Sequence, residues 1–204
     1  MAHIITKLEN FDNKRTKVTL DYSEVTFLLY KAEIRSLKIN EGEALTDEEL
    51  RRINDEILLP RAKKRVLYFM KNADKTRYQI RQKLREGLYP EEIIEKTMEF
   101  LDKYGFADDE QYAENYIEEL KGSRSRREIE AKLRSKGLSS QMLKESLTNV
   151  TAEDEYAAAK KALSRKYPHG IAAEDKNKAY GFLMRKGYSY DSIEHAMNIL
   201  KADS

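Results

Sequence analysis

The sequence has no cysteine and no tryptophan among its 204 residues, and it has only three prolines. The absence of cysteine excludes a disulfide framework, thiol catalysis and cysteine-ligated zinc, and it agrees with a reducing compartment. No stretch approaches the roughly 20 apolar residues of a membrane span. The N-terminus also lacks the apolar segment of a signal peptide. We therefore expect a soluble, cytoplasmic protein that makes no membrane contact.

Sequence motifs of catalysis are missing as well. His3, His169 and His195 are scattered without the spacing of metal ligands, and the chain has neither a P-loop nor a dinucleotide fingerprint. His195 follows Asp191 by four positions, which predicts an ion pair on a helix surface rather than a catalytic histidine. We expect no enzymatic activity and no cofactor.

Charge is abundant and unevenly distributed. Charged residues make up 36% of the chain and hydrophobic residues 40%, which favours thin helical layers with much solvated surface over one thick globule. The net charge of +2 conceals alternating bands. Residues 75–85 carry five basic side chains and no acids, residues 91–119 carry eleven acids and two lysines, and residues 121–136 carry seven basic side chains and two acids.

Three glycines mark an internal repeat. Gly87, Gly137 and Gly187 follow one another at intervals of 50 residues, and apolar residues recur one, six and thirteen positions after each of them. A glycine just past a helix adopts the left-handed conformation, and the apolar residue after it folds back on the last helical turn. We therefore predict three copies of a three-helix unit, in which each glycine is the left-handed end of a basic second helix.

Several helix starts in these copies carry capping residues. The candidates are Asp108 with Gln111, Ser125 with Glu128, Ser139, Ser189, and Pro90 in a first turn. Asp108 and Asp109 could also hold a metal, but acidic residues are favoured at a helix N-terminus, which explains the pair more simply. The first helix of the third copy is predicted over 152–166, and that of the first copy over 61–72.

The first sixty residues differ from the repeats. Segments 4–8, 15–20 and 25–29 are β-prone, with turns expected at Asn13-Lys14 and at Asp21-Tyr22-Ser23. A helix is predicted over 30–37. Thr46 with Glu49 forms a capping box that opens another helix, which reaches about Leu58 and ends at a junction at Pro60.

These patterns predict a mostly all-α fold of three tandem three-helix repeats in an elongated, curved arrangement, preceded by a small N-terminal β-hairpin and helix extension. The predicted boundaries are 1–60 for the extension, 61–107 for repeat 1, 108–150 for repeat 2 and 151–204 for repeat 3. Thirteen tyrosines could stack on bases. Core packing is the simpler interpretation for those at helical spacing, which are Tyr112, Tyr116, Tyr156 and Tyr180.

Basic residues recur on the second helix of every copy. Any single one is explained by a solvated helix face, but a stack of repeats would align them into a positive surface suited to phosphates or to an acidic protein. The candidate binding residues are Arg77, Lys83, Arg85, Arg124, Arg126, Arg127, Lys132, Arg134, Lys136, Arg185 and Lys186.

Three segments carry a resemblance to a known family. They are residues 74–84 (DKTRYQIRQKL), 105–113 (GFADDEQYA) and 125–138 (SRREIEAKLRSKGL). In this order and at this spacing they resemble the RecX family of bacterial regulatory proteins, over about residues 61–200. The third copy is the weakest match, and Glu86-Gly87 stands where the family more often has Lys-Gly.

The resemblance implies a non-enzymatic regulator of homologous recombination, DNA repair and the SOS response. Proteins of this family bind the RecA recombinase and its filament on single-stranded DNA. They mainly inhibit filament growth, ATP hydrolysis, strand exchange and coprotease activity. On this basis we expect a monomer whose basic face contacts acidic RecA surface and DNA phosphate together.

Two other functions stay open from the residues alone. A non-specific DNA-binding helical protein would bind naked DNA with a steep salt dependence. A helical-repeat scaffold for an unrelated protein partner would bind neither DNA nor RecA, and its basic helices would be solvated faces.

Overall fold

The N-terminal segments form a sheet because their apolar residues alternate onto one buried face. The computed structural model describes residues 2–21 and 25–202. The strands are β1 (Ala2–Asn10), β2 (Arg15–Leu20), β3 (Val25–Tyr30) and β4 (Ala44–Thr46). They form one sheet in the order β3-β2-β1-β4 with antiparallel neighbours, in which Val18 pairs with Leu8 on one side and with Phe27 on the other.

The three predicted strands are confirmed, and the short edge strand β4 was not predicted. The predicted turn at Asn13-Lys14 is present, and the Asp12 carboxylate accepts hydrogen bonds from the amides of Lys14 and Arg15 at 2.9 and 2.8 Å. The other predicted turn, at Asp21-Tyr22-Ser23, lies mostly outside the described residues. The predicted helix after β3 is α1 (Lys31–Ser36).

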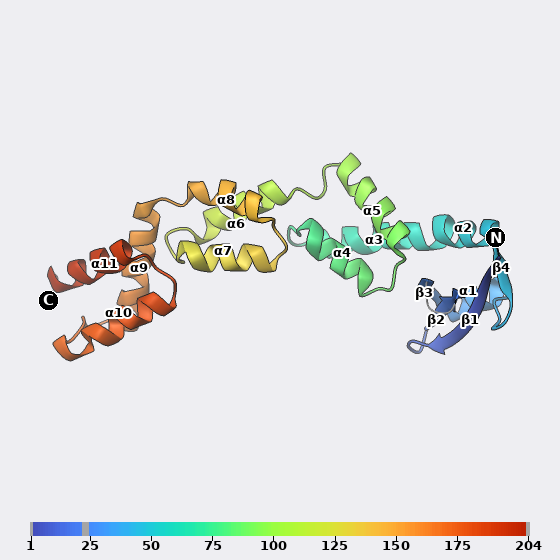
Figure 1. Ribbon diagram of the computed structural model, residues 1–204, viewed down its shortest axis with the longest axis horizontal. Coiled ribbons are helices and arrows are strands. Elements are labelled where there is room, and N and C mark those ends of the chain that lie inside the picture. The colour runs from blue at the N-terminus through green and yellow to red at the C-terminus, as the bar shows by residue number, and fades with distance from the viewer. Residues whose placement is uncertain (1, 22–24, 203–204) are drawn as a thin grey trace. The chain divides into compact units, whose positions relative to one another are not determined.

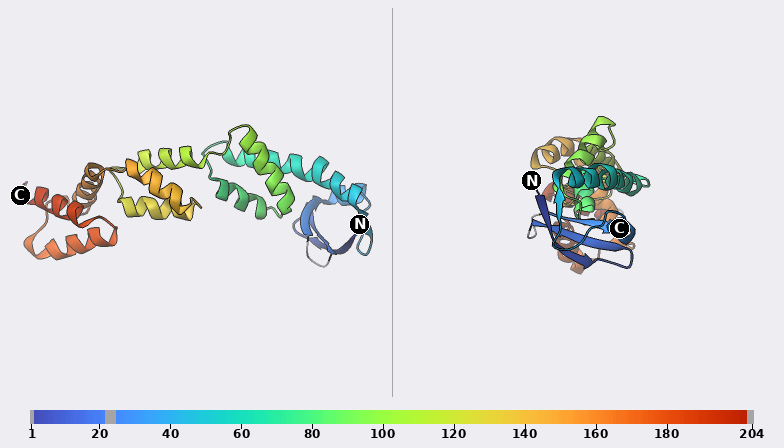
Figure 2. Two further views of the ribbon diagram at one scale, coloured as in Figure 1. Left: turned by 45° about the horizontal axis from the view of Figure 1, so that its top comes forward. Right: turned by 90° about the vertical axis from the view of Figure 1, so that its right-hand side faces the viewer.

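A single helical run leads from the sheet into the first repeat (Figures 1 and 2). It consists of α2 (Asp47–Arg52), the π-helical turn η2 (Ile53–Leu58) and α3 (Leu59–Met70). The predicted capping box is confirmed: Glu49 N donates to Thr46 Oγ1 at 3.2 Å, and Thr46 N donates to Glu49 Oε2 at 2.8 Å.

The predicted junction at Pro60 is wrong, because the helix continues through it. Leu58, immediately before α3, has helical angles of −72° and −46°. In the wider π-helical turn, the amide of Leu59 donates to the carbonyl of Asn54, five residues back. A wide turn just before proline accommodates its ring and its missing N–H, which would otherwise kink a regular α-helix.

The chain divides into two compact units, Met1–Ala107 and Asp108–Ser204. In the N-terminal unit, α3 packs with α4 (Arg77–Arg85) and α5 (Glu91–Lys103). Their buried residues, such as Ile80 and Leu101, belong to one hydrophobic core with Phe27 and Leu29 of the sheet. The sheet therefore packs on the first repeat, which buries the apolar face that a small sheet cannot bury alone.

The C-terminal unit contains two helical triplets, each with its own core. The first triplet is α6 (Asp109–Leu120), α7 (Arg126–Ser135) and α8 (Ser140–Ser146), extended by the 3₁₀ turn η3 (Leu147–Asn149). The second is α9 (Ala152–Lys166), α10 (Lys176–Arg185), preceded by the 3₁₀ turn η4 (Ala173–Asp175), and α11 (Tyr190–Ala202). The bounds of α9 match the predicted 152–166, and Gly170 after it has a φ of +86°.

Each second helix ends at a left-handed residue, but that residue is glycine in only two of the three copies. Gly137 and Gly187 have φ values of +89° and +82°, as predicted. In the first repeat the left-handed residue is Leu88, at +51°, so the prediction for Gly87 is wrong.

The hydrogen bonds that close the helices explain this difference. The amide of Tyr89 donates to the carbonyl of Leu84 at 3.3 Å, just as the amide of Leu138 donates to the carbonyl of Leu133 at 3.4 Å. The first repeat is therefore shifted by one residue relative to an alignment on the glycines. The repeat pattern predicted an apolar residue thirteen positions after Gly87, which is Phe100. The fully buried residue late in α5 is instead Leu101, one position later.

Most predicted caps are present, with three differences. One is that Glu128 turns its carboxylate to Arg124, so the predicted box of Ser125 with Glu128 is only half formed. Ser125 and Ser139 accept hydrogen bonds from the amides three residues later. Asp108 caps α6 through the amides of Glu110 and Gln111, but Gln111 turns its own side chain toward other residues of α6, so the box is half formed. Pro90 is the residue that precedes α5 rather than part of its first turn.

The aromatic residues of the C-terminal unit largely pack as predicted. The rings of Tyr112 and Tyr116 stack at a centroid distance of 6.0 Å against the core of the first triplet. The predicted ion pair of His195 with Asp191 is not formed within the described residues. The imidazole instead stacks on the ring of Tyr156, with centroids 4.4 Å apart.

Candidate anion-binding surface

The basic side chains of α4 face carboxylates of α5. The ion pairs join Arg77 to Asp102, Arg81 to Glu95, and Arg85 to Glu91. Arg81 Nη2 donates to Glu95 Oε2 at 2.9 Å, and this side-chain contact lowers the pKa of Glu95. The hydrogen bond from Arg77 likewise lowers the pKa of Asp102. In the first repeat, then, the predicted arginines are neutralised by the neighbouring helix.

Lys83, the fourth predicted cation of this repeat, is also engaged. Its ammonium group lies 3.0 Å from Glu86 Oε2 and 5.5 Å from the ring centroid of Phe69. The basic band of residues 75–85 therefore contributes to the packing of the N-terminal unit more than to a free positive surface.

The predicted cations of the second repeat fall into two groups. Arg124 pairs with Glu128 at 3.1 Å and Arg134 with Glu130 at 2.6 Å, both along α7. By contrast, the side chains of Arg126, Arg127 and Lys132 form no ion pair within the described residues. Exposed i, i+4 pairs are weak and exchange readily with a partner, so most of α7 can offer charge to an anion. Lys136 differs from both groups, since its ammonium group lies 5.8 and 5.6 Å from the ring centroids of Tyr112 and Tyr116.

The start of α7 lies against the end of α10. Ser125 is fully buried, and its Oγ donates to the carbonyl of Lys186 at 2.6 Å. A Cβ built on Gly187 would stand 3.0 Å from the Cβ of Arg127, so any larger residue would have to displace Arg127. The contact brings Arg127 together with Arg185 and Lys186 around a shared surface hollow. Predicted cations of two repeats thus meet within the C-terminal unit.

Another cleft, between the second and third repeats, was not predicted. We call it the inter-repeat cleft; its volume is about 520 Å³. Its cationic lining consists of Arg124, Lys161, Arg165, Lys166 and Lys186. Glu128 is its one carboxylate among the described lining residues, and Glu128 is already bound to Arg124.

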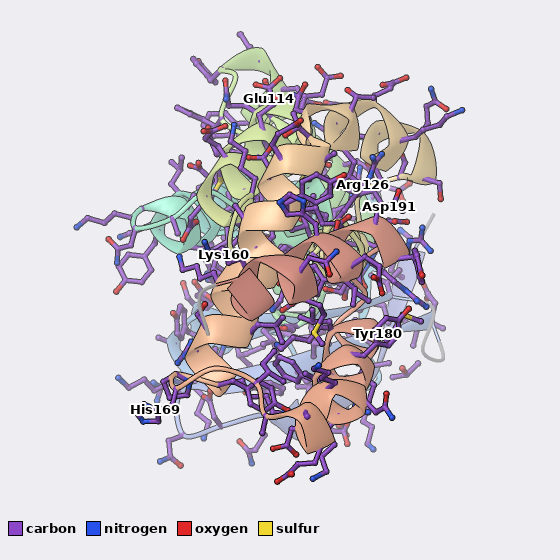
Figure 3. The ribbon with its side chains drawn as sticks, turned by 90° about the vertical axis from the view of Figure 1, so that its left-hand side faces the viewer. Glu114, Arg126, Lys160, His169, Tyr180 and Asp191 are labelled. Atoms are coloured by element: carbon purple, nitrogen blue, oxygen red, sulfur yellow. The ribbon has the colours of Figure 1, made fainter. Side chains whose placement is uncertain are left out.

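Three of these cations come from α9, a helix for which the sequence predicted the bounds but no binding residue. Lys161 and Arg165 lie four residues apart and therefore share a helix face. Lys166 lies over the ring of Phe182, 4.1 Å from its centroid. Figure 3 views the C-terminal unit with its side chains, and the labels Arg126, Lys160 and Tyr180 locate α7, α9 and α10. The doublets Lys160-Lys161 and Arg165-Lys166 were the sequence signal.

The floor of the inter-repeat cleft is apolar and neutral. The hydroxyl of Tyr188 donates to the carbonyl of Ala158 at 3.1 Å. Burial raises the pKa of Tyr188 to about 12, so the phenol is uncharged at neutral pH. The neutral phenol leaves the cationic side chains as the main charges that an anionic group would meet in this cleft.

Other kinds of site have no counterpart in the described parts of the chain. No cluster of three or more histidine and carboxylate side chains is arranged to hold a metal ion within residues 2–21 and 25–202. Across the same residues, no helix combines the length and the hydropathy that crossing a membrane would require.

The fold and the surface define a protein of tandem three-helix domains with a cationic face. Two family models match, described as the first and the third three-helix domain of RecX, over residues 62–101 and 153–197. The chain is 34% identical to the regulatory protein RecX of Clostridium acetobutylicum, covering 93% of this chain and 92% of that protein. It is 31% identical to that of Clostridium tetani, covering 96% and 94%.

The chain belongs to the RecX family of regulatory proteins. A crystal structure described as regulatory protein RecX has the same fold, with a TM-score of 0.63 and 24% identity over 96% of this chain and 99% of that one. Family membership makes this protein a regulator, as the resemblance implied.

Proposed function

We propose that this protein binds the RecA recombinase and its filament on single-stranded DNA, and that it mainly inhibits RecA. Membership of a family of regulatory proteins supports the regulatory role. The observation that carries the binding proposal is the concentration of unneutralised cations in the C-terminal unit, on α7, on α9 and at the end of α10.

The ion pairing of the predicted cations differs between the two units, and this difference reduces the number of residues that we propose as contacts. Arginines of α4 are bound to carboxylates of α5, so we propose that they support the fold. Arg126, Arg127 and Lys132 of α7, with Lys161 and Arg165 of α9, are proposed as the contacts to acidic RecA surface and to DNA phosphate. A filament presents both kinds of anion along one groove, which favours a composite target.

Charge reversal tests this proposal. The triple variant Arg126→Glu, Arg127→Glu, Lys132→Glu should lose suppression of RecA ATPase activity on single-stranded DNA. Because Arg127 packs on Gly187, the double variant Lys161→Glu, Arg165→Glu provides an independent test with exposed side chains. The matched control is Lys31→Glu, Lys38→Glu, Lys71→Glu, which reverses three exposed cations of the N-terminal unit and should leave suppression unchanged.

Circular dichroism establishes that each variant is folded. If both C-terminal variants suppressed RecA at the normal dose, the surface would not be the contact. A parallel titration with naked DNA at two salt concentrations distinguishes regulation of RecA from the second candidate function, which is non-specific DNA binding. The cleft's cations also suit phosphates, and tight salt-dependent binding without any effect on RecA would favour a DNA-binding protein instead.

A further inference from the structure

A second cleft, of about 290 Å³, lies within the N-terminal unit between the sheet and the first repeat. We call it the tyrosine cleft. The lining residues on which the argument rests are Tyr30, Arg61, Lys64, Arg65, Tyr68 and Tyr89. It combines aromatic rings with positive charge, and none of its described lining residues is acidic.

Two of its rings are presented to solvent. Tyr68 is 79% exposed on α3, which is unusual for an aromatic side chain that lines a cleft. Tyr30 is 42% exposed, and the guanidinium carbon of Arg61 lies 4.6 Å from its ring centroid. Arg61 is itself held by the carbonyl of Leu28 at 3.0 Å and by an ion pair with Glu33. Tyr30 is therefore a fixed platform, whereas Tyr68 is a free ring.

The cations divide in the same way. Arg61 is neutralised by Glu33, whereas Lys64 and Arg65 form no ion pair within the described residues. Arg65 is oriented by a hydrogen bond of 3.4 Å from its Nε to the carbonyl of Lys83. One oriented guanidinium and one mobile ammonium group thus stand beside the exposed rings, without a carboxylate to occupy them.

Gly87 keeps the floor of the cleft open. Its φ is not in the left-handed region, so the reason for glycine here is space. A Cβ on Gly87 would stand 2.8 Å from Cε2 of Tyr89, which would force the ring to move. Burial raises the pKa of Tyr89, and the charges of Arg61 and Arg65, which line the same cleft, act in the opposite direction.

We propose that the tyrosine cleft binds one nucleotide, with the base stacked on Tyr68 and the phosphate held by Lys64 and Arg65. Exposed rings beside unpaired cations are the arrangement with which proteins hold single-stranded nucleic acid, since every base has a face to stack and every nucleotide has a phosphate. A free nucleotide has the same chemistry. We assign the cleft to a single strand because Tyr68 is 79% exposed, so that a base stacked on it can belong to a longer chain whose other nucleotides stay in solvent.

The lack of tryptophan in the chain makes a direct test possible. The full-length variant Tyr68→Trp carries one fluorescent reporter on the rim of the cleft. A short oligothymidylate should quench its emission by stacking. Adding Lys64→Ala to this variant should weaken binding about fivefold to tenfold, because a phosphate contact is lost. The matched reporter is Tyr78→Trp, whose parent ring is 45% exposed on α4 outside the cleft, and its emission should not change.

A comparison of three ligands shows whether the cleft prefers a single strand, a duplex or a free nucleotide. A duplex of the same length should not quench the Tyr68→Trp reporter, since its bases are already stacked. Quenching by thymidine 5′-monophosphate as strong as that by the oligonucleotide would overturn the assignment to a strand. Unchanged emission of the Tyr68→Trp variant with every ligand, or equal quenching of the Tyr78→Trp variant, would overturn the proposal. This test uses no RecA and is independent of the regulatory proposal.

Discussion

Gly187 and Arg127 are in direct contact, although they belong to different repeats. A Cβ on Gly187 would lie 3.0 Å from both Cβ and Cδ of Arg127, and Gly187 also has a φ of +82°. The conformation and the close approach are separate reasons for glycine at this position. They can be distinguished because Gly122, with a φ of +70°, has no atom within 4 Å of such a Cβ.

Gly187→Ala should therefore destabilise the protein more than Gly122→Ala. Both substitutions place a side chain in the left-handed region, which costs about 1 kcal/mol. Gly187→Ala should cost about 1–3 kcal/mol more, because it also overpacks the contact with Arg127. Chemical denaturation of both variants measures the difference. Equal losses of unfolding free energy would mean that α10 and α7 are not packed this closely.

Gly87→Ala should be destabilising only while Tyr89 is present. Alanine normally stabilises a position with ordinary backbone angles by about 0.4–1 kcal/mol, but here its Cβ would meet the Tyr89 ring at 2.8 Å. In the background of Tyr89→Ala the substitution should become neutral or stabilising. A double-mutant cycle should give a coupling of about 1 kcal/mol or more. A coupling near zero would contradict the packing argument for Gly87.

Arg81→Ala and Lys132→Ala should have opposite profiles. Arg81 is half-buried beside Glu95 and Glu91, and its removal should cost about 1 kcal/mol, since Glu95 loses its partner while Glu91 keeps only Arg85. Lys132 has no ion pair within the described residues, so its removal should change stability by less than about 0.5 kcal/mol. Thermal unfolding measures the first effect, and the RecA ATPase assay the second. Loss of regulation in Arg81→Ala without any loss of stability would contradict this division.

His3 should make stability depend on pH. Its Nδ1 lies 2.8 Å from Asp21 Oδ2, its Nε2 lies 3.0 Å from Asp47 Oδ1, and the hydrogen bond to Asp21 raises its pKa most. The stabilisation is complete below the unfolded pKa of about 6.5 and is lost as pH rises through the higher folded pKa. The contact also lowers the pKa of Asp21, so the pair weakens again in strong acid.

Comparison of the wild type with His3→Gln tests this prediction. The difference in unfolding free energy should be less than about 1 kcal/mol, because the site is partly exposed. It should be larger at pH 5.5 than at pH 8.5. A difference that is the same at both pH values would mean that the imidazolium form is not the one bound by the two carboxylates.

Sequence periodicity and capping predicted the elements well where the signals are local. Thr46 with Glu49 opens α2, and α9 occupies the predicted residues, because caps and apolar faces depend on neighbours a few positions away. The strand β4 escaped prediction because three residues carry too little pattern, and it is formed by pairing with β1.

The alignment on glycines failed by one residue in the first copy for a physical reason. A left-handed position is defined by which amide closes the helix, and this depends on Tyr89 bonding to Leu84. Leu88 accepts a strained φ of +51° at that position. Gly87, beside Leu88, satisfies a different requirement, which is space under the Tyr89 ring. The sequence alone does not show whether a glycine is needed for its backbone angles or for its lack of a side chain.

The sequence predicted that the candidate surface is basic, but it did not predict which residues form it. The recurrence of basic residues indicated anion binding, yet the neutralisation of Arg77 by Asp102 depends on how α4 and α5 face each other. Lys161 and Arg165 entered the surface because the second and third repeats form a cleft beside α9. Which side chains of two packed helices meet cannot be read from the spacing of residues within either helix.

The uninterrupted helical run from Asp47 to Met70 has a mechanical consequence. Because α2, η2 and α3 form one continuous helical run, the orientation of its N-terminal end fixes the rotation of its C-terminal end about the helix axis. One inserted residue in this run would turn the two ends by about 100° relative to each other. The π-helical turn before Pro60 already contains such a change of winding. Because the sheet also packs into the core of the first repeat, the two cannot rotate independently, and such an insertion would have to disrupt that core.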